Sequence, residues 1–416
     1  MSKDSDILIT DYYCASNRGD AAILEGELEA LKQEFPDSDI TVMTENPDAA
    51  EFIHGIDAVR QVMAPFSFGL SKRNMLRIYL TLLIPFLRLE NHSLVPDSVV
   101  DRANLEYYFE ADLIISTGGT HLTDPYFPGK VGVLWELFFC KMIGKKVVIY
   151  GQTLGPFERR PYRPLTRFVL NRLDYVITRD RQSEKLVKEL GVSTPIETTA
   201  DPAFSMSFDI ERERAIDYFD CKETSGLEGK CVSLSVRKWS YFSEDSNEED
   251  YIIGIANLAD ELVDEGFKVV FASTCTGIAG YHKDDRMYPR KIIEEMDNSE
   301  NVMILSGEYT PQEISEIYGE MEFHIGTRMH SNILALMQKT PVYAIKYQFK
   351  TEGMMEMFDI EEYMIDIDEI NEDKLLNNVL ESLENRDIIQ KKIENNLDEV
   401  KSESRRSSKI ISEKVL

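Results

Sequence analysis

The chain has 416 residues, of which 43% are hydrophobic, which is enough for two domains of roughly 200 residues each. Its 46 Lys and Arg residues against 74 Asp and Glu residues give a formal net charge of −28. This charge excludes bulk attraction to nucleic acid or to anionic lipid, so an anionic ligand would have to be bound by a local cluster of positive groups.

The N-terminus and the cysteines indicate a cytoplasmic protein. "MSKDSDILIT" is acidic and lacks a long apolar run, so an ordinary secretory signal is not expected. No span of about 20 uninterrupted apolar residues occurs, and no transmembrane helix is predicted. The five cysteines are scattered without a CxxC pair, which suits a reducing compartment and argues against a zinc site. We expect five free thiols.

Short apolar runs alternate with longer amphipathic stretches, and this alternation predicts βαβ units with a parallel sheet, an α/β fold. "DILITDYY" (6–13) reads as a strand, "NRGD" as a turn, and 21–35 as a helix that ends before Pro36. "DITVMT" is the second strand. "ADLIISTGGT", "KKVVIYGQTLGPF" and "LDYVITRDRQS" then close on glycine, hydroxyl or charged residues. Such residues lie at the carboxyl edge of an open parallel sheet, where ligands bind.

The pattern weakens after "TTADPAF" (198–204), which predicts a linker between Phe204 and Lys230. Further strands follow in "CVSLSVR", "FKVVFAST", "NVMILSG", "MEFHIGTR" and "TPVYAIKY". We predict two Rossmann-like domains, 1–205 and 206–387, that face each other across a cleft. Residues 388–416 read as a solvated helix or a frayed tail.

Several strand ends in the first half carry groups that can bind a ligand. The helix start in "NRGDAAI" offers backbone N–H groups to an anion or to sugar hydroxyls, and Asp20 could accept from a hydroxyl or simply cap the helix. In "STGGTHLTDPY", His121 and Asp124 could contact hydroxyls or transfer a proton, or the stretch is a tight turn with a surface histidine. Arg179 is either an anion ligand or the partner of Asp180 or another helix carboxylate. The candidates here are Asn17, Gly19, Asp20, Gly118, Gly119, His121, Asp124, Gln152 and Arg179.

The sharpest pattern is "GTRMHS", where an apolar strand gives way to an apolar helix. Arg328 offers a planar fork suited to a carboxylate or phosphate, and His330 offers an imidazole that can accept or donate a proton. The helix would point its N-terminus at the same anion. Alternatively, the histidine caps the helix and the arginine pairs with a surface acid. Arg237 ends the first strand of the second half, and Lys350 follows the last one.

Two further stretches have open interpretations. Residues 74–90, "NMLRIYLTLLIPFLRLE", could form a helix on a membrane surface, although a buried domain helix is favoured. "RRPYRPLTRFVLNRL" (159–173) has five arginines and no acid. It either faces an anionic, lipid-linked substrate or is a solvated helix face.

The order of these motifs resembles the polysaccharide pyruvyl transferase family. "NRGDAAI", "STGGTHLTDP", "GQTLGPF", "RDRQSEKLVKELGV" with "ADPAF", and "GTRMHSNILALMQKTPVYAIKYQFKTEG" carry the resemblance, from about Asp6 to Met355. It implies a fold like the two-domain B-type glycosyltransferases. It also implies transfer of the pyruvyl group of phosphoenolpyruvate to a glycan, commonly as a cyclic ketal. "RMH" falls at the family's Arg-x-His position. Thr120 and His121 stand where the family often has a third glycine.

The resemblance implies a role for each candidate residue. Arg328, Arg237 and Lys350 are expected to bind the donor without metal or cofactor, and His330 to move a proton. Asp20, His121 or Asp124 would orient or deprotonate the acceptor, a cell-surface glycan or a lipid-linked oligosaccharide reached by peripheral membrane contact. Two alternatives stay open. One is a nucleotide-sugar glycosyltransferase, although "GTRMHSNILALMQKTPV" contains no acid for the Glu-x7-Glu pair of many such enzymes. The other is a non-catalytic glycan-binding relative.

Overall fold

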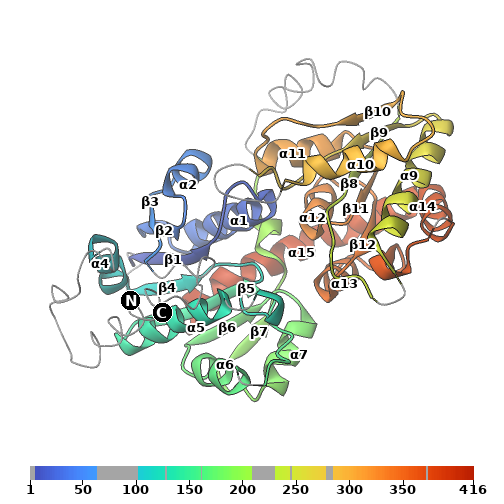
Figure 1. Ribbon diagram of the computed structural model, residues 1–416. Helices are drawn as coiled ribbons and strands as arrows, with labels where there is room; N and C mark the ends of the chain where they lie inside the picture. The colour runs from blue at the N-terminus through green and yellow to red at the C-terminus, as the bar shows by residue number, and fades with distance from the viewer. Residues whose placement is uncertain are drawn as a thin grey trace. The chain divides into compact units, whose positions relative to one another are not determined.

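The computed structural model describes residues 5–62, 102–126, 129–160, 162–208, 230–243, 246–277, 284–371 and 373–416. The chain forms two compact units (Figure 1). Unit 1 comprises Met1–Ala15, Ile23–Met206 and Ser402–Leu416, and unit 2 comprises Ser16–Ala22 and Ser207–Lys401. Most of the predicted linker and the apolar stretch 74–90 lie outside the described residues.

Unit 1 contains a seven-stranded sheet of order β3-β2-β1-β4-β5-β6-β7, in which every neighbouring pair is parallel. The strands are β1 (Ile7–Tyr12), β2 (Ile40–Thr44), β3 (Ala58–Arg60), β4 (Leu113–Ser116), β5 (Lys146–Gln152), β6 (Tyr175–Thr178) and β7 (Ile196–Thr198). The helices are α1 (Arg18–Glu34), α2 (Pro47–His54), α4 (Arg102–Glu110), α5 (Gly129–Met142), α6 (Arg163–Leu170) and α7 (Arg181–Glu189), and the first turn of α1 groups with unit 2.

Both faces of this sheet are buried. Side chains alternate along a strand, and in β1 Ile7 and Ile9 enter one apolar cluster with Leu24 of α1, whereas Leu8 enters another with Leu137 of α5. Every residue of β1 is buried. Burial on both faces explains why the strands read as continuous apolar runs.

Unit 2 contains a six-stranded parallel sheet of order β10-β9-β8-β11-β12-β13. The strands are β8 (Cys231–Ser235), β9 (Lys268–Phe271), β10 (Val302–Ile304), β11 (Phe323–Gly326), β12 (Val342–Lys346) and β13 (Met364–Asp366). The α-helices are α9 (Glu248–Asp264), α10 (Tyr288–Glu294), α11 (Pro311–Gly319), α12 (Met329–Met337), α13 (Phe349–Glu356), α14 (Lys374–Glu384) and α15 (Arg386–Lys414). Two parallel sheets with alternating helices confirm the predicted pair of Rossmann-like domains.

The C-terminal stretch forms α15, a single helix of 29 residues. Its last part packs within unit 1, where Ile411 is fully buried in the core. The interpretation of this stretch as solvated was therefore wrong for its inner face. The serines there are also buried, because their hydroxyls find partners: Ser408 bonds Tyr150 Oη at 2.7 Å and Ser407 bonds Thr199 Oγ1 at 2.8 Å.

Among the described residues, no helix combines the length and the apolar character needed to cross a bilayer. Cys14, Cys140, Cys231 and Cys275 are buried free thiols, and the fifth cysteine, Cys221, lies outside the described residues.

Candidate functional site

Three neighbouring strands of unit 2 end at the same edge of the sheet and carry the predicted cations. Arg237 lies two residues after β8, Arg328 two residues after β11, and Tyr347 directly after β12. Lys350 lies in the first turn of α13. The charges of all three cations act on Tyr347. Sequence reasoning named these cations but gave the tyrosine no role.

Tyr347 is packed among cations and a second aromatic ring. Cζ of Arg237 lies 4.5 Å from the centroid of the Tyr347 ring and 5.4 Å from that of Trp239, and the two rings are 4.7 Å apart. Nζ of Lys350 lies 5.8 Å from the Tyr347 ring centroid. Burial raises the pKa of this phenol, but the charges of Lys350, Arg237 and Arg328 outweigh that effect and lower the pKa to about 7.

Arg328 is held by one buried carboxylate. Its Nε donates to Oδ2 of Asp285 at 2.6 Å, and Asp285 is only 5% exposed. Burial lowers the pKa of the guanidinium, but Asp285 reverses this and holds that pKa well above its usual value. The alternative of a surface acid was therefore wrong, because the partner is buried. The Nε contact fixes the plane of the guanidinium.

His330 lies in the first turn of α12 against the first turn of α1. A Cβ added at Gly19 would lie 2.4 Å from His330 Nδ1 and 2.9 Å from His330 Cβ. Asn17 caps α1: its Oδ1 accepts from the Gly19 N–H at 3.1 Å, and its Nδ2 donates to Asp20 Oδ2 at 2.8 Å. The predicted alternative of Asp20 as the cap was wrong. The structure thus places Gly19 against the histidine, and Asn17 links Gly19 to Asp20.

Replacing Gly19 with alanine is expected to displace the His330 ring and to destabilise unit 2 by about 1–3 kcal/mol, as overpacking does. Chemical denaturation measures the loss. In the double variant Gly19→Ala with His330→Gly, both the ring and the Cβ of residue 330 are gone, so the clash is absent and most of the loss beyond that of His330→Gly should disappear. Additive losses in this cycle would show that His330 does not lie on Gly19.

Gly118 and Gly119 of unit 1 have structural reasons to be glycine. A Cβ at Gly118 would lie 2.7 Å from Ile23 Cγ2, and Gly119 has φ +128°, which disfavours other residues. Nε2 of Gln152, at the end of β5, donates to Ser116 Oγ at 2.8 Å and to Thr117 O at 2.7 Å. Gln152 therefore holds the β4 end from the neighbouring strand.

Arg179, directly after β6, is buried and connects three segments of unit 1 by hydrogen bonds. It donates to Thr153 Oγ1 at 2.8 Å, to Asp201 Oδ2 at 2.6 Å and to Thr120 Oγ1 at 2.9 Å. Asp180 caps α7 instead, accepting from the Ser183 N–H at 2.7 Å. The proposed pairing of Arg179 with Asp180 was therefore wrong, because the carboxylate partner is Asp201, 22 residues away.

His121 and Asp124 also have structural partners. His121 is 6% exposed, with Nε2 3.1 Å from Gly118 O, and burial lowers its pKa to about 4, so the ring is neutral at pH 7. The alternative of a surface histidine was wrong. The Asp124 carboxylate forms an ion pair with Lys130 and accepts from the backbone N–H groups of Glu158 at 2.5 Å and Arg159 at 2.7 Å. These contacts occupy both of its oxygens.

Sequence reasoning missed a group of buried carboxyls beneath this edge. Glu27 of α1 accepts from Thr117 Oγ1 at 2.6 Å and from the Gly118 N–H at 3.4 Å, and it is fully buried. Asp11, with φ +69°, accepts from Ser116 Oγ at 2.6 Å. The signal for Glu27 was its place in the apolar stripe of α1, between Leu24 and Leu31.

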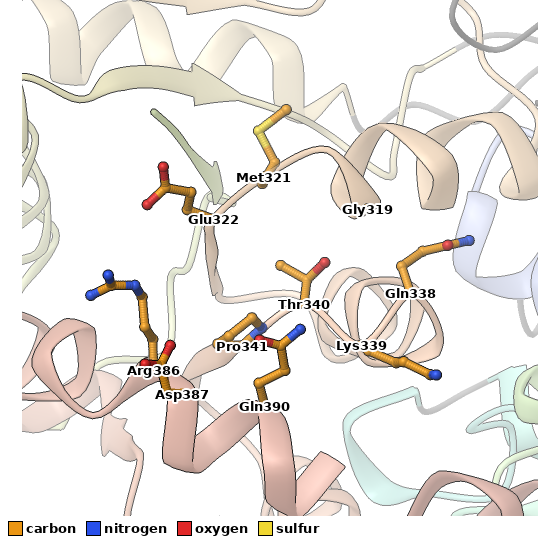
Figure 2. Close-up of a pocket in the computed structure, with 10 residues that line it drawn as sticks. All are labelled: Gly319, Met321, Glu322, Gln338, Lys339, Thr340, Pro341, Arg386, Asp387 and Gln390. Carbon is orange, nitrogen blue, oxygen red and sulfur yellow. The ribbon is translucent and has the colours of Figure 1, made fainter. Parts of the chain in front are cut away.

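A surface pocket of about 300 Å³ lies elsewhere on unit 2. Figure 2 shows its lining from three segments: the end of α11 to Glu322, the loop 338–341, and the start of α15. Glu322 precedes β11 and Pro341 precedes β12. The pocket is therefore at the amino edge of the sheet, opposite the carboxyl edge at which such folds bind ligands.

Comparison with solved structures gives the fold. The chain is similar to the UDP-GlcNAc 2-epimerase from Methanocaldococcus jannaschii, with a TM-score of 0.61 and 11% identity over 98% of this chain and 99% of that one. It is also similar to a glycosyltransferase from Rickettsia africae, with a TM-score of 0.61 and 10% identity over 99% and 98%. These likenesses confirm the predicted glycosyltransferase B-type fold and concern the fold alone.

Comparison of sequences gives the family. The chain is 25% identical over 406 residues to the amylovoran biosynthesis protein AmsJ of Erwinia amylovora, covering 93% of this chain and 94% of the relative. A family model described as polysaccharide pyruvyl transferase matches residues 17–348, a range that contains Arg237, Arg328, His330 and Tyr347. The chain therefore belongs to the polysaccharide pyruvyl transferase family.

Proposed function

We propose that this chain transfers the pyruvyl group of phosphoenolpyruvate to hydroxyls of a cell-surface glycan or its lipid-linked precursor, forming a pyruvate ketal and releasing phosphate. The observation that carries the proposal is the gathering of Arg237, Arg328 and Lys350 around one tyrosine in a chain of net charge −28. A donor with a carboxylate and a phosphate close together needs such a cluster. Family membership supports the transfer, and the amylovoran relative supports a glycan acceptor.

The reaction balances with protein side chains as proton carriers. C3 of the enol gains a proton, a sugar hydroxyl oxygen bonds to C2 and loses its proton, and the C2–O bond to phosphate breaks. A second hydroxyl then bonds to C2 and loses its proton. Of the two hydroxyl protons, one replaces the proton given to C3 and the other leaves on hydrogen phosphate.

In this proposal Arg328, Arg237 and Lys350 bind the donor. Each charge-assisted hydrogen bond contributes on the order of 1.5–3 kcal/mol. Asp285 keeps Arg328 oriented, so little freedom is lost when a ligand binds. His330 carries a proton to or from the reacting atoms, which typically accelerates such a step roughly 10²–10⁴-fold.

We choose Asp20 as the group that receives the proton of the acceptor hydroxyl or orients it. Asn17 holds the Asp20 carboxylate in the first turn of α1, and His330 packs against Gly19 in the same turn. His121 and Asp124 are weaker choices than the sequence indicated, because both are engaged by structural partners. Gly118, Gly119, Gln152 and Arg179 would act by shaping the edge of unit 1.

The surface of α6 supports a lipid-linked acceptor. Its exposed positions are Arg163, Pro164, Leu165, Arg167 and Phe168, with Leu165 40% and Phe168 42% exposed. None of these residues is acidic. An amphipathic surface of arginine and apolar side chains suits the diphosphate and the hydrocarbon of a lipid carrier.

Charge reversal by Arg163→Glu with Arg167→Glu is expected to lower turnover of a lipid-linked acceptor at least about 10-fold more than turnover of a short soluble glycoside of the same sugar, since each cation near an anionic surface contributes about 1 kcal/mol. Reversal of two lysines on the exposed face of α7, Lys185 and Lys188, is the matched control. Equal losses on both acceptors would mean that the exposed face of α6 is only solvated and does not contact the acceptor.

The experiment that tests the proposal is phosphate release from phosphoenolpyruvate across a panel of glycan acceptors, with mass spectrometry of the product. A gain of one pyruvate less one water on the glycan is expected. Thermal shift with phosphoenolpyruvate and with nucleotide sugars runs alongside. If only a nucleotide sugar stabilises the protein and is turned over, the chain is a glycosyltransferase instead. If the protein responds to neither donor, the remaining assignment is a non-catalytic glycan-binding protein.

A further inference from the structure

We infer that Tyr347 is the internal counter-ion of the cationic site, ionised while the site is empty, and that it takes up a proton when an anionic ligand binds. The inference rests on the anion-binding part of the proposed function but not on the identity of the donor or on turnover. It gives the site a chemical property that membership of the family does not state: anion binding is coupled to proton uptake at a named atom.

The first support is the balance of charge at the strand ends. Arg328 has a carboxylate partner in Asp285. Arg237 Nε donates to the backbone carbonyl of Lys238 at 3.3 Å, and among the described residues its guanidinium forms no ion pair with a carboxylate. Its guanidinium lies against the Tyr347 ring instead. A cation in a partly buried place is costly without a counter-charge, and the phenol is the neighbouring group that can supply one.

The second support is that cations reach Tyr347 from three different segments of unit 2. Arg237 comes from the end of β8, Arg328 from the end of β11, and Lys350 from α13, while Trp239 covers the ring with an uncharged face. Asp285 acts through its bond to Arg328. The positive charges of Arg237, Arg328 and Lys350 converge on the phenol and favour loss of its proton, and the pKa of about 7 for Tyr347 agrees with this arrangement.

A second tyrosine near the same arginine behaves differently. Tyr251 of α9 bonds Thr327 Oγ1 at 2.9 Å and also feels the charge of Arg237, but burial dominates and the negative charge of Asp285 adds to it. These effects raise the pKa of Tyr251 to about 12. Proximity to Arg237 is thus insufficient, and the convergence of three cations distinguishes Tyr347.

Ligand binding reverses the balance. A bound dianion brings two negative charges to the cations that stabilise the phenolate, so the pKa of Tyr347 must rise. Above pH 7 the empty site holds mostly phenolate, so binding is accompanied by uptake of up to about one proton per site. The bound anion then shares the site with a neutral phenol that can donate a hydrogen bond to it.

The first experiment measures tyrosinate without ligand. The near-ultraviolet absorbance of the full chain is titrated from pH 6 to pH 9 for wild type and Tyr347→Phe. Wild type is expected to show a titration near pH 7 that Tyr347→Phe lacks. Tyr343→Phe is the matched control, because Tyr343 lies on the same strand with its hydroxyl bonded to Asn378 and with its pKa raised to about 12. It should titrate like wild type.

The second experiment adds the probe. Sulfate is used because it does not itself titrate in this range, with chloride at matched ionic strength as the control. At pH 8, sulfate is expected to remove the extra tyrosinate absorbance, and calorimetry in two buffers of different ionisation enthalpy should report uptake of close to one proton. Tyr347→Phe should bind sulfate without proton uptake.

A second variant tests the same titration if Tyr347→Phe folds poorly. Arg237→Gln removes one of the three cations and should move the titration midpoint to higher pH. Identical titrations in wild type and either variant, or sulfate binding without proton uptake, would overturn the inference. If sulfate shows the coupling and phosphoenolpyruvate does not bind, the proposed donor is wrong and the inference stands. If phosphoenolpyruvate turns over without proton uptake on binding, the proposed function stands and the inference is wrong.

Discussion

Replacing His330 with asparagine is expected to lower kcat for phosphate release from phosphoenolpyruvate about 100-fold or more, which is the usual contribution of a positioned acid or base. The donor KM should change little, because an interaction used mainly in the transition state affects kcat rather than binding. Asparagine at position 330 keeps a polar side chain against Gly19, and because it is smaller than the histidine ring it fits at this position. Steady-state phosphate release with varied donor at saturating acceptor measures both constants.

Melting curves control for damage to unit 2, since His330 lies in the first turn of α12. A folded His330→Asn variant with near-normal kcat would reduce the histidine to a packing partner of α1. The proton would then be carried by Asp20, by His121 or by water. A rise in donor KM without loss of kcat would make His330 a binding group.

Replacing Arg328 with lysine is expected to affect binding rather than turnover, in contrast to His330→Asn. The donor KM should rise about 10–100-fold, with a smaller loss of kcat. Lysine keeps the charge but loses the planar fork, and one or two charge-assisted hydrogen bonds contribute on the order of 1.5–3 kcal/mol. Lysine also cannot contact Asp285 with one nitrogen and the donor with two others, as the present geometry allows.

Asp285→Asn is the matched variant, because it keeps Arg328 and removes only the charge that orients it. Donor binding should weaken less in Asp285→Asn than in Arg328→Lys. An unchanged donor KM in Arg328→Lys would remove this arginine from the donor site and leave it as the buried partner of Asp285. Direct binding of phosphoenolpyruvate by calorimetry would separate KM from true affinity.

The alternation of apolar runs and amphipathic helices predicted both sheets, because strands buried on two faces leave an unmistakable pattern. The short strands β3, β7 and β13, three residues each, were not predicted. Placing Arg237 and Arg328 at strand ends, and Lys350 shortly after a strand, required only the sequence, since the carboxyl ends of parallel strands share one edge. Their gathering around a common point required the strand order β8-β11-β12.

The pairing of charged residues could not be predicted, because the partners are distant in the sequence. Arg179 pairs with Asp201 and not with its neighbour Asp180, and Arg328 pairs with Asp285, 43 residues away. The role of Tyr347 was missed for the same reason: the cations that act on it come from the ends of β8 and β11 and from α13, whereas the stretch "AIKYQF" shows only Lys346 beside it. A motif gives the type of a residue, but its protonation depends on neighbours that the fold supplies.

The buried carboxyls of unit 1 make its stability decrease as the pH rises from the acidic range to about pH 8. Burial raises the pKa of Glu27 from 4.5 to about 8 and that of Asp11 from 3.8 to about 6. Because both folded-state values exceed the unfolded ones, the stability present below pH 4 is lost as the pH rises through the folded values. Tyr347, with its lowered pKa, has the opposite sign and adds stability to unit 2 as the pH rises from 7 toward 10. Rising pH therefore lowers the stability of unit 1, because Glu27 must ionise while buried beside the Gly118 loop, whereas it raises the stability of unit 2 through the charge balance of the cationic site.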